Sequence, residues 1–164
     1  MLKIIAVSAL LMVGFNQVGN AQDKPRKSPT QTVNGSVDGT NVIVTYGSPS
    51  VKGRTIWGEL VPYGKVWRTG ANEATTIELH GDVMIEGKEV KEGKYSLFTI
   101  PNKDSWTIIL NSVADQWGAY KYDESKDVAR VSVKSREGKM NEMLTMVIKN
   151  NELIIKWDKL EVPV

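Results

Sequence analysis

The stretch that decides the fold is Met143-Leu-Thr-Met-Val-Ile-Lys-Asn-Asn-Glu-Leu-Ile-Ile-Lys-Trp157. At its centre, Asn150 and Asn151 can both adopt the positive φ angles of a tight hairpin turn. Counting outward from that turn places charge opposite charge on one face and hydrophobe opposite hydrophobe on the other, in the pairs Lys149 with Glu152, Ile148 with Leu153, Met146 with Ile155 and Leu144 with Trp157. Because a shift by one residue would exchange the two faces, the stretch predicts a β-hairpin of fixed register.

Short β-branched or aromatic runs separated by turn residues continue through the chain from about Thr30. Asp38-Gly39 predicts a second hairpin turn, which sets Val33 opposite Val44 and Gly35 opposite Val42. Glu86-Gly87 predicts a third turn. Further strands are expected over residues 65–69, 74–79, 94–100, 105–111 and 128–134.

The pair formed by residues 94–100 and 105–111 carries hydrophobes on both faces. Leu97 and Ile108 lie on one face, and the other face holds Phe98, Ile100 and Ile109. Burial on both sides places this pair centrally, with a second layer on one side and a covering loop or helix on the other. The sequence therefore predicts an all-β domain over residues 31–164, a single-domain antiparallel β-sandwich or jelly-roll-like fold of about ten short strands. One or two short helices are expected, within residues 53–63 and 122–126.

Composition excludes several kinds of chemistry. The 164 residues are 41% hydrophobic, which suits one domain with one core. The chain has no cysteine and a single histidine, His80, so disulfides, thiolate nucleophiles and sites needing two imidazoles are excluded. A net charge of +2 gives no chain-wide attraction to nucleic acid or to an anionic membrane. No metal site and no cofactor is expected.

The N-terminus has the order of parts of a signal peptide. Lys3 precedes an apolar run from Ile4 to Phe15, and Gly19-Asn20-Ala21 supplies small residues before a cut between Ala21 and Gln22. The run is too short for a comfortable membrane span. We therefore expect a signal peptide over residues 1–21, a flexible polar lead-in over 22–30, no membrane span after cleavage, and a location in the periplasm or outside the cell.

A specialised stretch between Gly53 and Thr76 contains the candidate site residues Trp67, Arg68, Asn72 and Glu73. They combine a flat apolar surface with a fork donor, an amide and a carboxylate, which suits a small polar ligand. Trp117 lies in a predicted loop, where its ring can stack on a sugar, and Tyr120 can line the same groove.

Each candidate has a structural alternative. Arg68 and Glu73 can form an ion pair at the junction of two sheets. Asn72 beside Gly70 can make a turn, and Tyr120 can cover the end of the core. The tryptophans, Trp67 among them, can belong mostly to the core, with Trp117 the best candidate for an exposed ring.

Three stretches resemble a known family. They are Val61–Thr75, Gly93–Pro101 and the run from Trp106 that ends in Gln116-Trp-Gly-Ala-Tyr-Lys-Tyr-Asp123. Together they resemble the signatures of exported bacterial proteins catalogued as domain of unknown function 2911. The resemblance extends from about residue 30 to the C-terminus. It implies one exported domain and assigns no activity, cofactor or site residue.

Three functions from different classes remain open. The first is a binding module for a small polar or carbohydrate-like ligand, with its site on loops at one end of the sandwich. The second is an envelope-associated structural or interaction domain that works through an edge strand. The third is a hydrolase in which Glu73, the weak catalytic candidate, is a general acid or base. No Gly-x-Ser-x-Gly motif supports the hydrolase.

Overall fold

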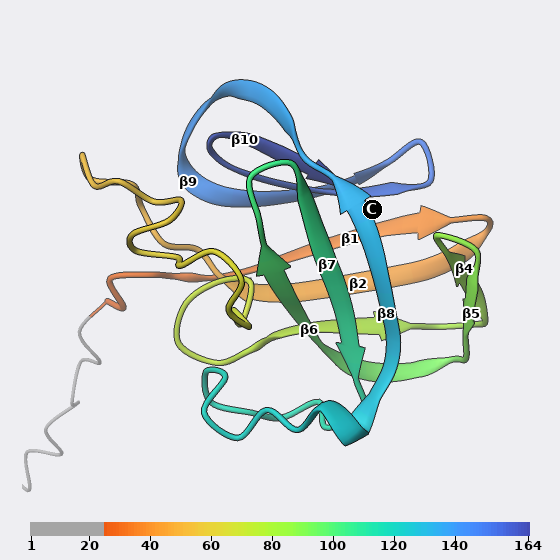
Figure 1. Cartoon of the computed structure of the whole chain (residues 1–164). Coiled ribbons are helices and arrows are strands. Elements are labelled where there is room, and N and C mark those ends of the chain that lie inside the picture. The colour runs from red at the N-terminus through yellow and green to blue at the C-terminus, as the bar shows by residue number, and fades with distance from the viewer. Residues whose placement is uncertain (1–24) are drawn as a thin grey trace, which may run out of the picture.

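The computed structural model describes residues 25–164, which form ten antiparallel strands and one short 3₁₀ helix (Figure 1). The predicted signal peptide, residues 1–21, and the first three residues of the lead-in lie outside the described residues. The elements are β1 (Thr30–Val37), β2 (Thr40–Gly47), β3 (Thr75–Leu79), β4 (Val83–Ile85), β5 (Lys88–Val90), β6 (Gly93–Pro101), β7 (Ser105–Asn111), η1 (Glu124–Lys126), β8 (Asp127–Lys134), β9 (Arg136–Lys149) and β10 (Glu152–Pro163).

All three predicted two-residue turns are confirmed. Both residues of each turn have positive φ, with 47° and 82° at Asp38-Gly39, 46° and 79° at Glu86-Gly87, and 54° and 60° at Asn150-Asn151. Such turns follow the right-handed twist of the strands they join. The registers that they set are also confirmed, including Val33 opposite Val44 in β1–β2 and Ile148 opposite Leu153 in β9–β10.

One predicted pair in β9–β10 is not formed. The register shifts between Lys156 and Asp158, and Asp158, with φ of 53°, pairs with Asn141. Leu144 donates its N–H to the carbonyl of Pro49 at 2.9 Å instead of facing Trp157. A β-bulge of this kind bends the strand. Near the turn β9 pairs with β10, and around Leu144 it also contacts the segment after β2.

The strands form a two-layer β-sandwich, which confirms the predicted fold class. The first layer is a six-stranded sheet in the order β1-β2-β3-β6-β7-β8, and the β9–β10 hairpin lies across one of its faces (Figure 1). Neighbours in this sheet follow the chain order, apart from the β4–β5 ribbon inserted between β3 and β6. The sheet is therefore an antiparallel meander with the hairpin folded back over it.

Two local predictions differ from the structure. Residues 53–63 form turns and one bridge, between Trp57 and Val61, where a short helix was expected. Positive φ angles at Gly53 and Gly58 explain the absence of that helix. Residues 65–69 form a single bridge, Trp67 to Thr99, in place of a strand. Within residues 25–164, no helix has the length and apolar character needed to cross a membrane.

Four tryptophans join the two layers on the inner face of the sheet. Trp106 of β7 and Trp157 of β10 are 1% and 2% exposed, as expected for inward-facing positions. Trp57 and Trp67 pack against them from the long segment between β2 and β3, with ring centroids 5.0–6.1 Å apart. Most of these ring pairs meet edge to face, the arrangement that aromatic quadrupoles favour. We call these four residues the tryptophan cluster.

The outer face of the sheet carries a second, smaller core. Phe98 of β6 and Ile109 of β7 are fully buried there, together with Ala74. Parts of two loops pack on them, through Val66 and Ala74 from the first and Ala119 and Tyr122 from the second. This confirms the predicted two-sided burial of β6 and β7, and the covering elements are loops.

The tryptophan cluster yields a prediction with an internal control. Trp157→Ala is expected to lower the free energy of unfolding by about 3–5 kcal/mol, because it opens a cavity between the layers. Trp117→Ala, at a side chain that is 61% exposed, is expected to change it by less than about 0.5 kcal/mol. Urea denaturation followed by circular dichroism measures both, and similar losses for the two variants would contradict the assignment of the core.

Candidate functional site

Two loops far apart in the sequence lie together over the outer face of the sheet (Figure 1). The first spans residues 64–74 and the second residues 112–123. The Ala74 N–H donates to the Gln116 carbonyl at 2.9 Å, and the Gly118 N–H donates to the Asn72 carbonyl at 3.1 Å. Glu73 and Trp117 form an isolated antiparallel bridge. We call these two segments the paired loops.

The first loop is held to β6 by backbone and hydroxyl hydrogen bonds. Trp67 and Thr99 exchange two backbone bonds of 2.8 and 2.9 Å. The buried hydroxyls of Thr69 and Thr99 lie 3.1 Å apart, and the Thr75 hydroxyl donates to the Thr69 carbonyl at 2.8 Å. These hydrogen bonds satisfy the buried hydroxyl groups and fix the first loop against β6.

The backbone at the end of β2 and that of the first loop approach closely, which explains the glycines at positions 47 and 70. A Cβ at Gly47 would lie 2.0 Å from the Ala71 carbonyl oxygen, and a Cβ at Gly70 would lie 2.8 Å from the Gly47 carbonyl oxygen. Ala71 also donates its N–H to the Gly47 carbonyl. The end of β2 therefore locks the first loop at a distance that only glycine allows.

A polar network anchors the second loop. Asp127 accepts hydrogen bonds from the Tyr122 hydroxyl, from Asn111 Nδ2 at 2.9 Å and from Arg130 Nη1 at 3.0 Å. Burial raises the pKa of Tyr122, and the neighbouring Asp127 carboxylate raises it further. Tyr122 therefore stays a neutral donor at neutral pH.

All six candidate residues lie within the paired loops, but the Trp67 side chain is directed away from the surface that these loops form. Trp67 packs in the tryptophan cluster, while its neighbour Val66 packs on the outer core. This alternation follows from the bridge to Thr99, since successive side chains of an extended segment point to opposite faces. Trp67 is thus separated from the other candidates by the backbone of its own loop.

Arg68 lies beside Gly118 and Tyr120. A Cβ at Gly118, where φ is 65°, would be 2.9 Å from the Tyr120 ring and 3.7 Å from Arg68 Nη1. The Tyr120 side chain is 84% exposed. Within residues 25–164, Arg68 Nε is buried and has no hydrogen-bond partner. The guanidinium and an exposed aromatic ring are therefore close neighbours on this surface.

Glu73 pairs with the lead-in. Arg26 Nη1 donates to both carboxylate oxygens of Glu73 at 2.9 Å, so the alternative ion pair between Arg68 and Glu73 is not formed. Asn72 Nδ2 donates to the Ser28 carbonyl at 3.1 Å. The lead-in was expected to be flexible, and its described part, from residue 25, makes these defined contacts with the first loop.

A shallow hollow of about 240 Å³ opens beside Trp117. Its lining residues are Glu73, Ala74, Thr76, Ala114, Asp115, Gln116 and Trp117. Arg68 and Tyr120 are not among them, so the paired loops carry two adjoining areas.

Gln116 in this hollow has a fixed orientation. Its Nε2 donates to Asn111 Oδ1 at 3.2 Å and to the Val113 carbonyl at 2.7 Å. These two acceptors assign the amide, and its buried Oε1 has no partner within residues 25–164. Sequence reasoning did not select Gln116 or Asp115, although both directly precede Trp117.

Glu73 is ionised at neutral pH. Its own backbone N–H lowers the pKa of the carboxyl group most, partial burial opposes this, and Arg26 lowers the pKa further. This carboxylate is paired with Arg26, and in the hollow it lies next to the Asp115 side chain and the Trp117 indole.

Comparison with known proteins gives one match. The family model described as “Protein of unknown function (DUF2911)” matches residues 28–164 and so includes both of the paired loops. This confirms the resemblance found in the three sequence stretches. No curated protein and no solved structure gives a significant match.

The titration of Glu73 tests the contact with the lead-in. Arg26→Gln is expected to raise the pKa of Glu73 while leaving it below the ordinary glutamate value, since the backbone hydrogen bond remains. Carbon-detected NMR of the glutamate carboxyl groups measures it, with Lys27→Gln as the control.

The sign of the stability effect follows from the lowered pKa. The contribution of Glu73 to stability is present above its unfolded-state pKa and is lost as the pH falls through its folded-state pKa. A pKa that does not move in Arg26→Gln would contradict the ion pair.

Proposed function

The chain belongs to the DUF2911 family, and on that premise we propose that it is an exported module that binds a small carbohydrate-like ligand on the paired loops. One observation carries the proposal: an indole ring that is 61% exposed, Trp117, shares a hollow with the Glu73, Asp115 and Gln116 side chains. Export is supported by the charged start, apolar run and small-residue cut site of residues 1–21.

The chemistry of the hollow favours a ligand rich in hydrogen-bond donors. Carboxylates accept hydrogen bonds only, and the hollow is lined by those of Glu73 and Asp115. A flat aromatic ring beside acceptors suits a sugar, which offers an apolar C–H face and several hydroxyl donors. Since the Glu73 and Asp115 side chains both line the hollow, neutral sugars and amino sugars fit better than uronic acids.

The surface beyond Gly118 extends the contact. Tyr120 supplies a second exposed ring, and Arg68 Nη1 lies close to it beside Gly118. Two exposed rings on fixed loops lose little conformational freedom when a ligand binds, which supports recognition by a preformed surface.

The small volume of the hollow limits the affinity that we expect for a ligand. A site of about 240 Å³ is smaller than most small-molecule pockets. We therefore expect a dissociation constant of about 1 mM for a disaccharide, corresponding to roughly 4 kcal/mol. At that strength, chemical-shift titration is more suitable than thermal stabilisation.

The hydrolase alternative is less well supported. A general acid at neutral pH needs a raised pKa, and the backbone hydrogen bond and Arg26 both lower the pKa of Glu73.

Titration of the ¹⁵N-labelled protein with chitobiose, glucosamine and glucuronate tests the proposal. Chitobiose and glucosamine are expected to shift the amide signals of Ala74 and Gly118, and glucuronate to have a weaker effect. Trp117→Ala is expected to weaken binding by about tenfold, the upper range for the loss of one aromatic contact. Tyr63→Ala, at an exposed aromatic outside the paired loops, serves as the matched control.

Glu73→Gln separates binding from folding. This substitution is expected to remove the response to glucosamine while leaving the unliganded Tm within a few degrees, because the side chain is half exposed. Loss of folding in Glu73→Gln, or equal titrations for Trp117→Ala and the unmodified protein, would support a structural role for the paired loops.

A further inference from the structure

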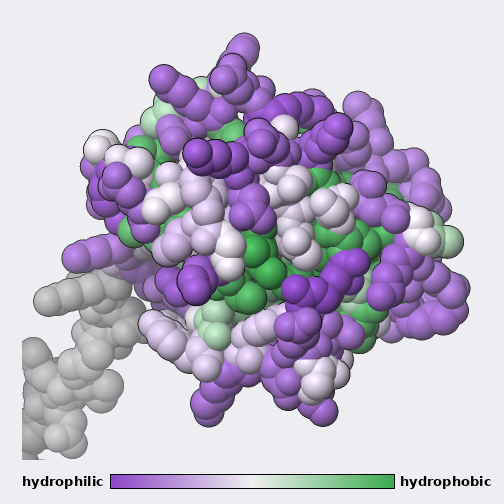
Figure 2. All heavy atoms as spheres, in the orientation of Figure 1, coloured by the Kyte–Doolittle hydropathy of each residue, from purple (hydrophilic) through white to green (hydrophobic). Residues whose placement is uncertain are grey.

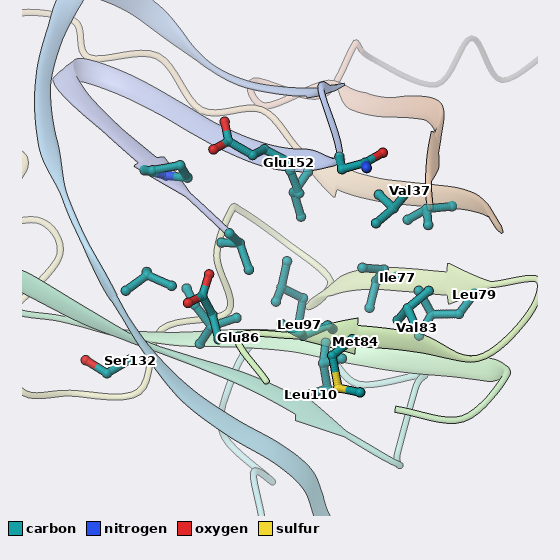
Figure 3. Close-up of a pocket in the computed structure, with 18 of the residues that line it drawn as sticks. Val37, Ile77, Leu79, Val83, Met84, Glu86, Leu97, Leu110, Ser132 and Glu152 are labelled. Carbon is teal, nitrogen blue, oxygen red and sulfur yellow. The ribbon is translucent and has the colours of Figure 1, made fainter. Parts of the chain in front are cut away.

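A cavity of about 450 Å³ lies between the six-stranded sheet and the turn end of the β9–β10 hairpin (Figure 3). The sheet contributes side chains from β1, β2, β3, β6, β7 and β8, and Figure 3 shows Leu97 and Leu110 pointing from the sheet toward the hairpin. The β4–β5 ribbon lines a further side through Val83 and Met84. This cavity is on the opposite face of the sheet from the paired loops.

The interior of the cavity is apolar. Its sheet side is formed by buried aliphatic residues such as Ile77, Leu79 and Ile108, each at most 5% exposed. Met84 of the ribbon is 57% exposed and also lines the cavity, which places it at the rim. Figure 2 shows one face of the molecule, where hydrophobic residues gather across the middle and hydrophilic residues surround them.

The volume exceeds what ordinary packing leaves. Protein interiors contain few voids larger than a water molecule, and an apolar cavity of about 150 Å³ already accommodates benzene. Four tryptophans fill the space between the layers at the other end of the sandwich. At this end the layers meet through smaller aliphatic side chains, which leave a space of about 450 Å³.

Charged side chains stand around the apolar space. Glu86 lies in the turn of the β4–β5 ribbon, Glu152 begins β10, and Lys134 ends β8. Within residues 25–164, none of the three forms a side-chain hydrogen bond or an ion pair. The rim therefore carries two carboxylates against one ammonium group, a negative balance that is free to act on a ligand.

We propose that this cavity is a second binding site, which takes a small apolar molecule whose polar end is cationic or uncharged. The apolar body displaces water from the aliphatic lining, and the polar end stays at the rim beside Glu86 and Glu152. A carboxylate-ended molecule of the same length meets the negative balance of the rim and binds more weakly. The site is independent of the paired loops and of any sugar bound there.

Fluorescence of N-phenyl-1-naphthylamine, a neutral apolar probe, tests the site directly. The full chain is expected to enhance its emission in a saturable manner with one probe per protein. Decylamine and decanol are expected to displace the probe, and decanoate to need a concentration about tenfold higher than decylamine. The Trp117→Ala variant, changed only at the paired loops, is expected to bind the probe as the unmodified protein does.

Isoleucine methyl signals locate the ligand without any substitution. Ile77 and Ile108 line the cavity, whereas Ile100 packs on the outer face of the same sheet. Decylamine is expected to shift the methyl signals of the first two and to leave that of Ile100 in place. Equal shifts at all three, or none at the first two, would overturn the proposal.

Two sets of variants test the volume and the charge separately. Ile77→Phe fills part of the cavity and is expected to weaken probe binding at least about tenfold. Glu86→Lys combined with Glu152→Lys, at surface positions, is expected to reverse the preference so that decanoate displaces the probe better than decylamine. An unchanged preference in the charge variant, or absence of saturable probe binding to the unmodified protein, would contradict the site even if Ile77→Phe did not fold.

Discussion

Burial on both faces of β6 and β7 is the constraint on which the rest of the structure depends. Phe98 and Ile109 point to one side of the sheet, and Leu97 and Ile108 point to the other. Neither set can face water without losing the hydrophobic free energy that folds the domain. The hairpin β9–β10 covers the inner side, and the paired loops cover the outer side (Figure 1).

The two coverings differ in how completely they fill the space. The outer covering is thin, so the loops that seal Phe98 must leave their own polar groups and the Trp117 ring at the surface. The inner covering is tight at the tryptophan cluster and loose beside the β4–β5 ribbon. The hollow beside Trp117 and the cavity therefore both arise from the same sheet, one on each face.

Sequence reasoning succeeded where the determinants are local. Two-residue turns and alternating side chains fix a hairpin from a few neighbours, and this is why the three turns and the two-sided pair were predicted correctly. The bulge at Asp158 accompanies a contact between β9 and the segment after β2, and no local sequence pattern contains that contact.

The candidate site shows the same division. Arg68, Glu73 and Trp117 were selected because polar and aromatic residues concentrate in the two loops, and the structure places Glu73 but not Arg68 in the hollow with Trp117. Three other features depend on how distant segments meet. They are the burial of Trp67 in the tryptophan cluster, the contact between Arg26 and Glu73, and the cavity. Such packing is a property of the assembled layers and has no signature in a single segment.

Native-state hydrogen exchange of the Ala74 and Gly118 amides tests the central claim most directly. Both amides belong to loops, and both donate hydrogen bonds between the paired loops over the outer core. If two-sided burial holds the loops in place, these amides exchange slowly, with protection comparable to that of the amides in β6 and β7. Fast exchange of both amides, with β6 and β7 still protected, would show that the loops are not docked and would contradict the account.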